Sequence, residues 1–299
     1  MKADRDTAQS RIGMSNFFMN TRELNYHIVI VTHNSQDSIT LCLESILSQT
    51  VSDYMITIVD SGSREREYLQ KIHGDKVRIL YESNIGFSRA NNLAAKDFID
   101  TIPYTIFVNP DVVLPGEFLS DIGDYLKINK EIGILGPKLL RYDLEKNRES
   151  DIIDSTGIFQ KWYGRWYDRG QGEIDHQQYD DNYLMPEAIC GALMVCSSDA
   201  IKRVQISQNE FFRNNFFMYK EDIELSIRTK AGGYPIHYNP KIIAFHCRGW
   251  KTRNEMSYLS KHFSAKNELF INRKRGPVKF LFSLCKLIFV ELQSVMGRK

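Results

Sequence analysis

The sequence contains 299 residues, of which 42% are hydrophobic and 25% charged, a composition typical of a soluble globular protein with a sizeable core. We find no run of about 18 apolar residues and no apolar segment near the start, so we expect neither a membrane-spanning helix nor a secretory signal peptide. The five cysteines include no C-x-x-C pair. They argue against zinc-finger and redox proteins and predict reduced thiols in a cytosolic protein.

The first half of the chain alternates short apolar runs with helical patterns. Residues 1–25 are polar and are expected to form an N-terminal extension. Strand, helix, strand, helix at short intervals is typical of right-handed βαβ units, and hence of an α/β fold with a mostly parallel central sheet flanked by helices. The predicted strands are 26–31, 56–59, 77–81 and 105–108; the predicted helices follow Ser35 or Ser38, which can cap the first, and span about 88–97.

Polar residues follow each predicted strand at the point where its apolar run ends. The carboxyl ends of parallel strands lie on one edge of a sheet, where open α/β sheets bind their ligands. We therefore expect these side chains to converge on one cleft: Thr32, His33 and Asn34; Asp60 and Ser61; Asn84 and Gly86; Asn109 and Asp111.

The segment Asn109-Pro110-Asp111 ends the last of these strands, because proline has no N–H to donate to a sheet. A carboxylate just beyond a central strand can hold a hard cation, which in turn can hold a diphosphate. From these residues alone, an Asx-type turn that only closes a loop explains the pattern equally well.

The second half is less regular. An aromatic, glycine-rich loop at 162–170 suits either stacking on sugars or a packed lid, and the run 189–195 predicts a core strand. Glu221 and Asp222 stand near the start of a predicted helix that reaches about Lys230, where acidic residues suit the helix dipole. Two short strands are expected at 235–238 and 242–245, and His246 ends the second.

Residues 251–299 differ in charge, with eleven Lys and Arg against three Asp and Glu. A basic cluster precedes the apolar run 280–290, which is too short to span a bilayer and contains Lys286. This pattern predicts an interfacial helix with a basic collar; packing of that helix on the body or on a second subunit of a homodimer is the alternative. The cluster consists of Arg273, Lys274, Arg275 and Lys279.

Five motifs, in order and spacing, resemble the family 2 glycosyltransferases with the GT-A (Rossmann-like) fold, above all bacterial rhamnosyltransferases and galactofuranosyltransferase-like enzymes of surface polysaccharide synthesis. The resemblance covers about residues 28–250 and implies a GT-A domain at 26–250, followed by the helical basic tail 251–299. The motifs are V-T-H-N-S (31–35), V-D-S-G-S (59–63), N-I-G-F-S-R-A-N-N (84–92), N-P-D-V (109–112), and K-E-D-I-E-L (220–225) followed by F-H (245–246).

The resemblance implies a role for each matching position. Thr32, His33 and Asn34 would line the nucleotide pocket, Asp60 would accept a hydrogen bond from a pyrimidine base, and Ser61 would lie near the ribose. Asn84 and Gly86 would border the cleft, with Arg89 near the phosphates. Asn109 and Asp111 occupy the place of a D-x-D metal motif, and Asn109 adds no charge there. Asp222 would be the catalytic base, with Glu221 beside it at the sugar, and His246 a second ligand of Mg²⁺ or Mn²⁺.

Chemical reasoning favours the same reaction. Glycosyl transfer needs positive charge at the departing diphosphate and a general base at the acceptor hydroxyl. Glu221 and Glu224 can raise the pKa of Asp222 by like-charge repulsion, or can orient neighbours and pair with Arg228. One base without an evident nucleophile favours direct displacement with inversion.

The resemblance therefore implies an inverting enzyme that transfers L-rhamnose from dTDP-L-rhamnose to a saccharide or lipid-linked oligosaccharide at the inner face of the cell membrane. A galactofuranosyl- or other UDP-sugar transferase and a non-catalytic glycan-binding module are the alternatives. The missing G-x-G-x-x-G argues against a dinucleotide-binding oxidoreductase, and the acidic body argues against a nucleic-acid partner.

Overall fold

The computed structural model describes residues 25–180, 185–247 and 256–296. The expected N-terminal extension lies outside the described residues except for Asn25. The boundary expected at residue 250 also falls outside them, within 248–255.

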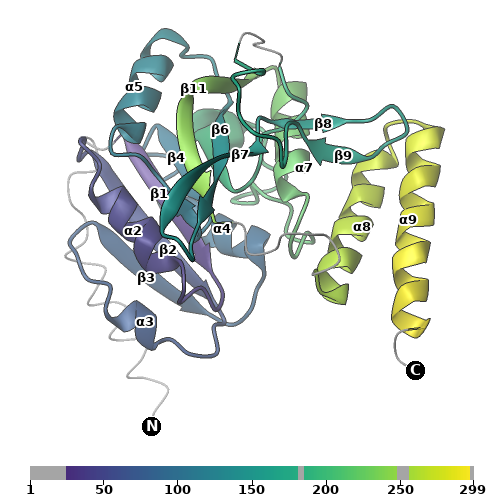
Figure 1. Ribbon diagram of the computed structural model, residues 1–299, viewed down its shortest axis with the longest axis horizontal. Helices are drawn as coiled ribbons and strands as arrows, with labels where there is room; N and C mark the ends of the chain where they lie inside the picture. Colours follow the sequence, from purple (N-terminus) through teal and green to yellow (C-terminus); the bar gives the residue numbers. More distant parts are fainter. Residues whose placement is uncertain (1–24, 181–184, 248–255, 297–299) are drawn as a thin grey trace.

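A central sheet is flanked by helices on both faces (Figure 1). Its strand order is β3-β2-β1-β4-β10-β6-β11-β5, with β7 paired to β6. The strands are β1 Tyr26–Thr32, β2 Tyr54–Ser61, β3 Val77–Glu82, β4 Tyr104–Val108, β5 Val112–Val113, β6 Ile134–Asp143, β7 Arg148–Ser155, β10 Leu193–Ser197 and β11 Ile236–His246. The helices are α2 Ile39–Leu47, α3 Glu67–Gln70, α4 Phe87–Ala95, α5 Phe118–Ile128, α6 Ser198–Arg203, α7 Glu221–Ala231, α8 Tyr258–Asn272 and α9 Pro277–Met296.

The half of the sheet built from β1, β2, β3 and β4 is parallel, as the alternation of strands and helices predicts. Thr32 lies opposite Asp60 across the β1–β2 pair, and Ile30 lies opposite Val108 across the β1–β4 pair. The polar residues that follow these strands therefore lie at one edge of the sheet. Ser38 is the N-cap residue of α2, but its side chain makes no capping hydrogen bond.

The second half of the sheet is mixed, because β10 runs antiparallel to both β4 and β6. The strand expected at 189–195 starts only at Leu193, since the N–H groups of Ile189 and Gly191 donate to side chains of α7. The two short strands expected at 235–245 are one strand, β11. Its register against β6 shifts between Asn239 and Ile243, where Pro240 lacks the N–H that regular pairing needs.

Two apolar clusters fill the space on either side of the sheet. One joins Ile28, Ile30 and Ile56 to α2, α3 and α5. The other joins Val29 and Val31 to α4, α6 and α7. Successive strand residues thus contribute to opposite faces, which is the pattern of a sheet buried on both sides.

The aromatic loop forms a hairpin, β8 Ile158–Gln160 and β9 Trp166–Asp168, that packs against α8 and α9 (Figure 1). Trp166 is buried and its Nε1 donates to Asn272 of α8 at 3.3 Å, while the ring of Tyr163 lies edge-on to Phe282 of α9, 4.9 Å between centroids. Of the two roles expected for this loop, sugar stacking or packing, packing is therefore right for Trp166 and Tyr163, whereas Trp162 is exposed. Among the described residues, no helix is both long and apolar enough to cross a membrane.

Candidate active site

The turns that follow β1 and β2 interlock through short polar side chains. The backbone N–H of Asn34 donates to Ser63 Oγ at 2.8 Å, and that of Arg64 donates to Asn34 Oδ1 at 2.8 Å. His33 Nδ1 lies 2.8 Å from the Ser61 carbonyl oxygen, and Thr32 Oγ1 lies 3.1 Å from the Tyr68 hydroxyl. The structure therefore brings the first two predicted groups of site residues together.

Asp60 is fully buried at the end of β2. Its Oδ1 accepts from the Ser63 N–H at 3.1 Å, and its Oδ2 lies 2.6 Å from Arg66 Nε. Arg66 was not predicted, because no pattern in its neighbourhood distinguishes it from a surface arginine. The Ser63 amide and the Arg66 guanidinium thus hold the carboxylate of Asp60 in place.

The loop after β3 joins the same edge. Ser61 Oγ accepts from the Ile85 N–H at 3.1 Å. Gly86 has a φ of 80° and lies so close to Phe217 that a Cβ would be 2.6 Å from the Phe217 ring and carbonyl. Only glycine fits this position without displacing Phe217. Asn84 is exposed two residues earlier.

Arg89 is not brought together with the other predicted residues. It is exposed on α4, and its Nε donates to the carbonyl of Asn214 at 3.2 Å. The surface hollow that it lines also contains Glu82, Lys96 and Asn209, none of which is a predicted site residue. The expected place of Arg89 near the phosphates stays a prediction.

Asp111 and His246 meet across the β5–β11 pair, with 3.3 Å between Asp111 Oδ1 and His246 Nε2. The other ring nitrogen, Nδ1, lies 2.8 Å from Oδ2 of Asp154, which is fully buried on β7. Burial alone would lower the pKa of His246, but the two flanking carboxylates raise it to about 10. Asp154 was missed, although the apolar run ending in Asp154-Ser155-Thr156-Gly157 repeats the signal used for the earlier strands.

These donors fit a divalent cation, because the same carboxylates that draw a proton to the imidazole would draw a metal ion. Carboxylate oxygen and imidazole nitrogen are ligands that Mn²⁺ and Mg²⁺ sites use, with diphosphate oxygens and water completing the shell. Among the described residues, no three His, Cys, Asp or Glu side chains are grouped so as to hold a metal by themselves.

Asp222 lies in the first turn of α7, aligned by two backbone amides. Gly191 N–H donates to its Oδ2 at 2.9 Å, and Ile223 N–H donates to its Oδ1 at 2.8 Å. A Cβ on Gly191 would lie 2.9 Å from the Cβ of Asp222, so glycine permits this approach. Burial raises the pKa of Asp222, and the charge of Lys220 and the two amides offset part of that rise.

The Gly191–Ala192 segment connects the carboxylate of Asp222 to the metal-binding candidates. Gly191 holds Asp222, and the next residue, Ala192, accepts from the Asn109 N–H at 2.9 Å. Cys190 has its pKa raised well above the usual value by burial and then by the charges of Asp168, Asp154 and Asp222. Asp222 and the Asn109 backbone are therefore held by adjacent residues of one segment.

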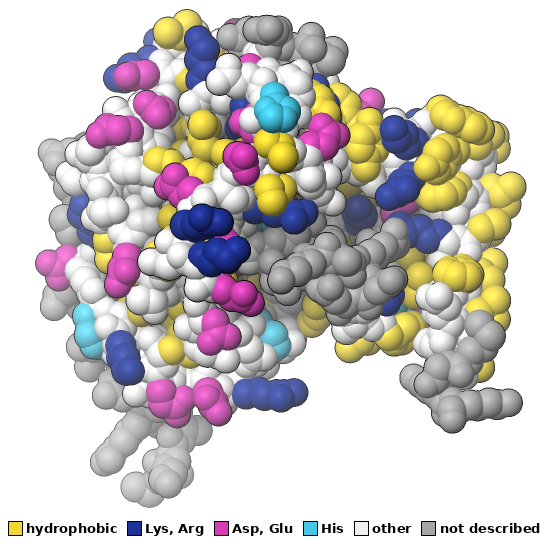
Figure 2. All heavy atoms as spheres, in the orientation of Figure 1, with side chains coloured by type: hydrophobic (Ala, Val, Ile, Leu, Met, Phe, Trp, Pro, Cys, Tyr) yellow, Lys and Arg dark blue, Asp and Glu magenta, His cyan; other side chains and the backbone are white. Residues whose placement is uncertain are grey.

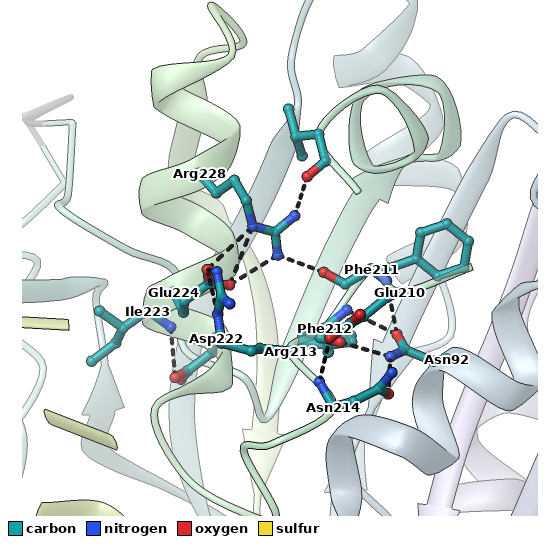
Figure 3. A network of polar contacts seen from close by, with 11 residues as sticks. Asn92, Glu210, Phe211, Phe212, Arg213, Asn214, Asp222, Ile223, Glu224 and Arg228 are labelled. Carbon is teal, nitrogen blue, oxygen red and sulfur yellow. Dashed lines mark hydrogen bonds and ion pairs between the residues drawn. The ribbon is translucent and has the colours of Figure 1, made fainter. Parts of the chain in front are cut away.

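Glu224 and Arg228, both on α7, join this helix to the segment 211–214 (Figure 3). Arg213 Nη2 and Arg228 Nη2 each lie 2.9 Å from a carboxylate oxygen of Glu224. Arg228 also donates to the carbonyl of Phe211 at 2.5 Å, and Asn92 accepts from the N–H groups of Phe211 and Phe212. Pairing of Glu224 with Arg228 is confirmed, and this network fixes how the helix of Asp222 sits on α4.

Glu221 is 7% exposed, and no hydrogen-bond partner for its Oε2 lies among the described residues. Burial, and then the charge of Asp222, raise the pKa of Glu221 to about 8. A carboxyl group whose pKa is higher in the folded than in the unfolded chain costs stability once pH exceeds its unfolded value. The folded protein should therefore lose stability as pH rises from about 4.5 to 8.

Replacement of Glu221 by Gln should remove this loss, because an amide cannot ionise. We expect the melting temperature of E221Q to exceed that of the wild type at pH 9 but not at pH 4.5. Each kcal/mol gained in the free energy of unfolding should raise the melting temperature by about 2–4 °C. Thermal melts across this pH range measure the difference. E131Q, which alters an exposed glutamate, is the control; an equal effect in both variants would contradict the role of burial.

Comparison with known proteins gives a relative of similar sequence and solved structures of similar fold. The chain is 23% identical over 245 residues to the rhamnosyltransferase WbbL of Escherichia coli K12, covering 79% of this chain and 88% of the relative. Its fold is similar to that of GalNAc-T7 with UDP, GalNAc and Mn²⁺ (TM-score 0.63, 13% identity, 84% of this chain and 48% of the other). It is also similar to that of the mannosyltransferase PcManGT from Pyrobaculum calidifontis with GDP-Man and Mn²⁺ (TM-score 0.54, 13% identity, 90% and 70%).

The chain spans about half the length of GalNAc-T7, and both solved structures share only the fold with it at this level of identity. The sequence model of one family, described as glycosyl transferase family 2, matches residues 27–185, which contain β1 to β9 and the predicted residues from Thr32 to Asp111. The GT-A fold and the catalytic class expected from the motifs are thereby confirmed. The chain belongs to glycosyl transferase family 2.

Proposed function

We propose that this glycosyltransferase moves L-rhamnose from dTDP-L-rhamnose to a saccharide or lipid-linked oligosaccharide acceptor, with inversion at the anomeric carbon. The similarity to a rhamnosyltransferase over most of both chains supports the donor. The observation that carries the reaction type is Asp222, a half-buried carboxylate aligned by two amides, one of them from Gly191, next to the residue that binds the Asn109 amide. Bacterial surface polysaccharide is the proposed product.

The interlocked turns after β1 and β2 are the proposed pocket for the nucleotide. Asp60 offers a buried acceptor to the N–H of a pyrimidine base, and Thr32, His33 and Asn34 lie directly beside it. Ser61 would lie near the ribose, and Asn84 and Gly86 would border the diphosphate. Asn109 and Glu221 would contact the donor sugar.

In the proposed step, the oxygen of the acceptor hydroxyl attacks the anomeric carbon, and Asp222 takes the proton of that hydroxyl. The bond from that carbon to the phosphate oxygen breaks, and the electron pair leaves with the nucleoside diphosphate. Burial raises the basicity of Asp222, and the two amides fix its direction. Asp111 and His246 would hold Mn²⁺ or Mg²⁺, which supplies positive charge to the leaving diphosphate.

Replacement of Asp222 by Asn should lower kcat by about 10²–10⁴-fold, because the amide cannot accept the proton. KM for the donor should change little, since Asp222 contacts the acceptor. Steady-state kinetics with a panel of dTDP-, UDP- and GDP-sugars measures both values. D199N, which alters an exposed carboxylate on α6, is the control.

The donor panel also tests the substrate. Turnover of dTDP-L-rhamnose in preference to UDP-sugars is the expected result. Turnover of a UDP-sugar alone would contradict the rhamnose donor, and no turnover by the wild type with any sugar, including slow hydrolysis, would contradict catalysis itself.

Replacement of His246 by Ala should weaken Mn²⁺ binding in the presence of dTDP by about 10–100-fold, because one ligand is lost. Electron paramagnetic resonance of free Mn²⁺ measures that affinity without turnover. H237A, on the same strand but paired with Tyr125, is the matched control. Equal affinities of H246A and H237A would remove His246 from the metal site.

The apolar face of α9 is proposed to rest on an anionic membrane surface. Six of its side chains are each at least half exposed, and hydrophobic atoms gather on this side of the molecule (Figure 2). Within the basic cluster, Arg275 pairs with Glu187 at 3.2 Å, and Lys279 donates to the neutral Gln160 and keeps its charge. Arg273 and Lys274 are exposed at the α8–α9 turn, and each is worth about 1 kcal/mol near an anionic leaflet. The six side chains are Val278, Leu281, Ile288, Phe289, Leu292 and Val295.

Vesicle flotation tests this surface. The protein should float with vesicles of phosphatidylglycerol and phosphatidylcholine, less so at high salt, and the double variant L281E/I288E should stay unbound. If the wild type instead sediments as a dimer without floating, and L281E/I288E is a monomer, a second copy covers this face and the membrane proposal is wrong.

A further inference from the structure

The turn that leads into α7 is strained. Tyr219 and Lys220 are consecutive non-glycine residues in the left-handed region, with φ of 67° and 70°. Each costs roughly 1–2 kcal/mol relative to right-handed backbone. Such residues persist only when their surroundings determine the conformation, and they gather at functional sites. This pair directly precedes Glu221 and Asp222, so it sets the direction in which the helix of the base begins.

A single side chain of α8 holds the backbone of this turn. Asn267 is 1% exposed, and its Nδ2 donates to the carbonyl oxygens of Met218 at 3.0 Å and Tyr219 at 2.8 Å. Carbonyl oxygens only accept hydrogen bonds, so the amide nitrogen must face them. Its two hydrogens serve two carbonyls that converge on one point.

Packing on both sides presses the same segment against its neighbours. The rings of Phe217 and Phe263 stack 5.1 Å apart, and Phe216 lies edge-on to Phe270 at 5.4 Å. On the opposite side, the Phe217 carbonyl accepts from the Phe87 N–H at 2.7 Å, at the start of α4. The segment 216–220 is therefore clamped between α8 and the loop proposed to border the nucleotide.

We propose that Asn267 is a positioning residue for Asp222. It stabilises the left-handed turn at Tyr219 and Lys220 and so aims the first turn of α7, which carries the base, toward the acceptor. The inference rests on the proposed role of Asp222. It makes α8 part of the catalytic apparatus, whereas the sequence suggested a division between the catalytic domain and the helical tail at residue 250.

The chain offers a matched control on the same helix. Asn272 is also fully buried, and its Nδ2 also donates twice, to the Gly164 carbonyl at 2.9 Å and to Ser283 Oγ at 2.8 Å. Its partners belong to the hairpin and α9, not to the turn before α7. Loss of either amide removes comparable hydrogen bonds, but only Asn267 holds that turn.

Replacement of Asn267 by Asp keeps the shape and places carboxylate oxygens against two carbonyl oxygens. We expect N267D to lower kcat by about 10-fold or more, because small displacements of a catalytic group are costly, while donor KM changes by less than about threefold. N272D should lower the melting temperature with kcat within about threefold of the wild type. An equal loss of kcat in N267D and N272D would overturn the inference.

A second variant separates positioning from general destabilisation. Glycine adopts left-handed backbone at little cost, so Y219G should recover at least about threefold of the lost kcat in the N267D background. It should recover none in the N272D background. Absence of recovery in N267D/Y219G would mean that Asn267 does not act through the turn.

The proposed function is tested separately, with the wild type: absence of turnover on the donor panel would contradict it. The positioning claim is then decided by hydrogen exchange of the amides at 221–224. Faster exchange there in N267D than in N272D supports it, and equal exchange refutes it.

Discussion

The site depends on the close approach of α7 to the backbone at Gly191. The absence of a side chain there lets the Cβ of Asp222 come within a distance that a Cβ on residue 191 would forbid. The Gly191 amide then binds the Asp222 carboxylate, and the neighbouring Ala192 carbonyl binds the Asn109 amide. Two adjacent backbone groups therefore set the spacing between the proposed base, Asp222, and the loop of Asp111. The main chain at Gly191 and Ala192 thus fixes how Asp222 lies relative to Asn109, although the two are far apart in sequence.

Negative charge accumulates around this stretch. Asp111, Asp154, Glu221 and Asp222 are brought in from three segments, the loop before β5, β7 and α7; Asp154 and Glu221 are buried, and Asp111 and Asp222 are half-buried. Such a group of carboxylates is costly when isolated, which is visible in the raised pKa of Asp222 and Glu221 and in the protonation that Asp111 and Asp154 favour on His246. A bound cation would relieve part of that cost, so metal affinity and the basicity of Asp222 are coupled in the proposed mechanism.

The parallel half of the sheet could be predicted from sequence, because strands β1 to β4 are apolar runs that end in polar residues. Asp60, Asp111, Asp222 and His246 were singled out by motif. In the fold Asp60 lies near the end of β2, Asp111 meets His246, and Asp222 accepts from Gly191. Arg66 and Asn267 could not be found, because their roles depend on contacts between distant segments. Arg89 was placed near the phosphates by its motif, and that place stays a prediction, because its contact in the structure is with the Asn214 carbonyl. The start of β10 was mispredicted because tertiary hydrogen bonds to α7 override strand propensity.

Helix α8 also completes a small apolar core beneath the base. Ile271 of α8 packs with Trp166 of the hairpin and with Phe216 and Ile223, which flank Asp222 in sequence. On a ribosome, α7 is made before α8, so its inner face stays uncovered until residue 271 has emerged. The apolar core beside Asp222 is therefore complete only once residue 271 has been made.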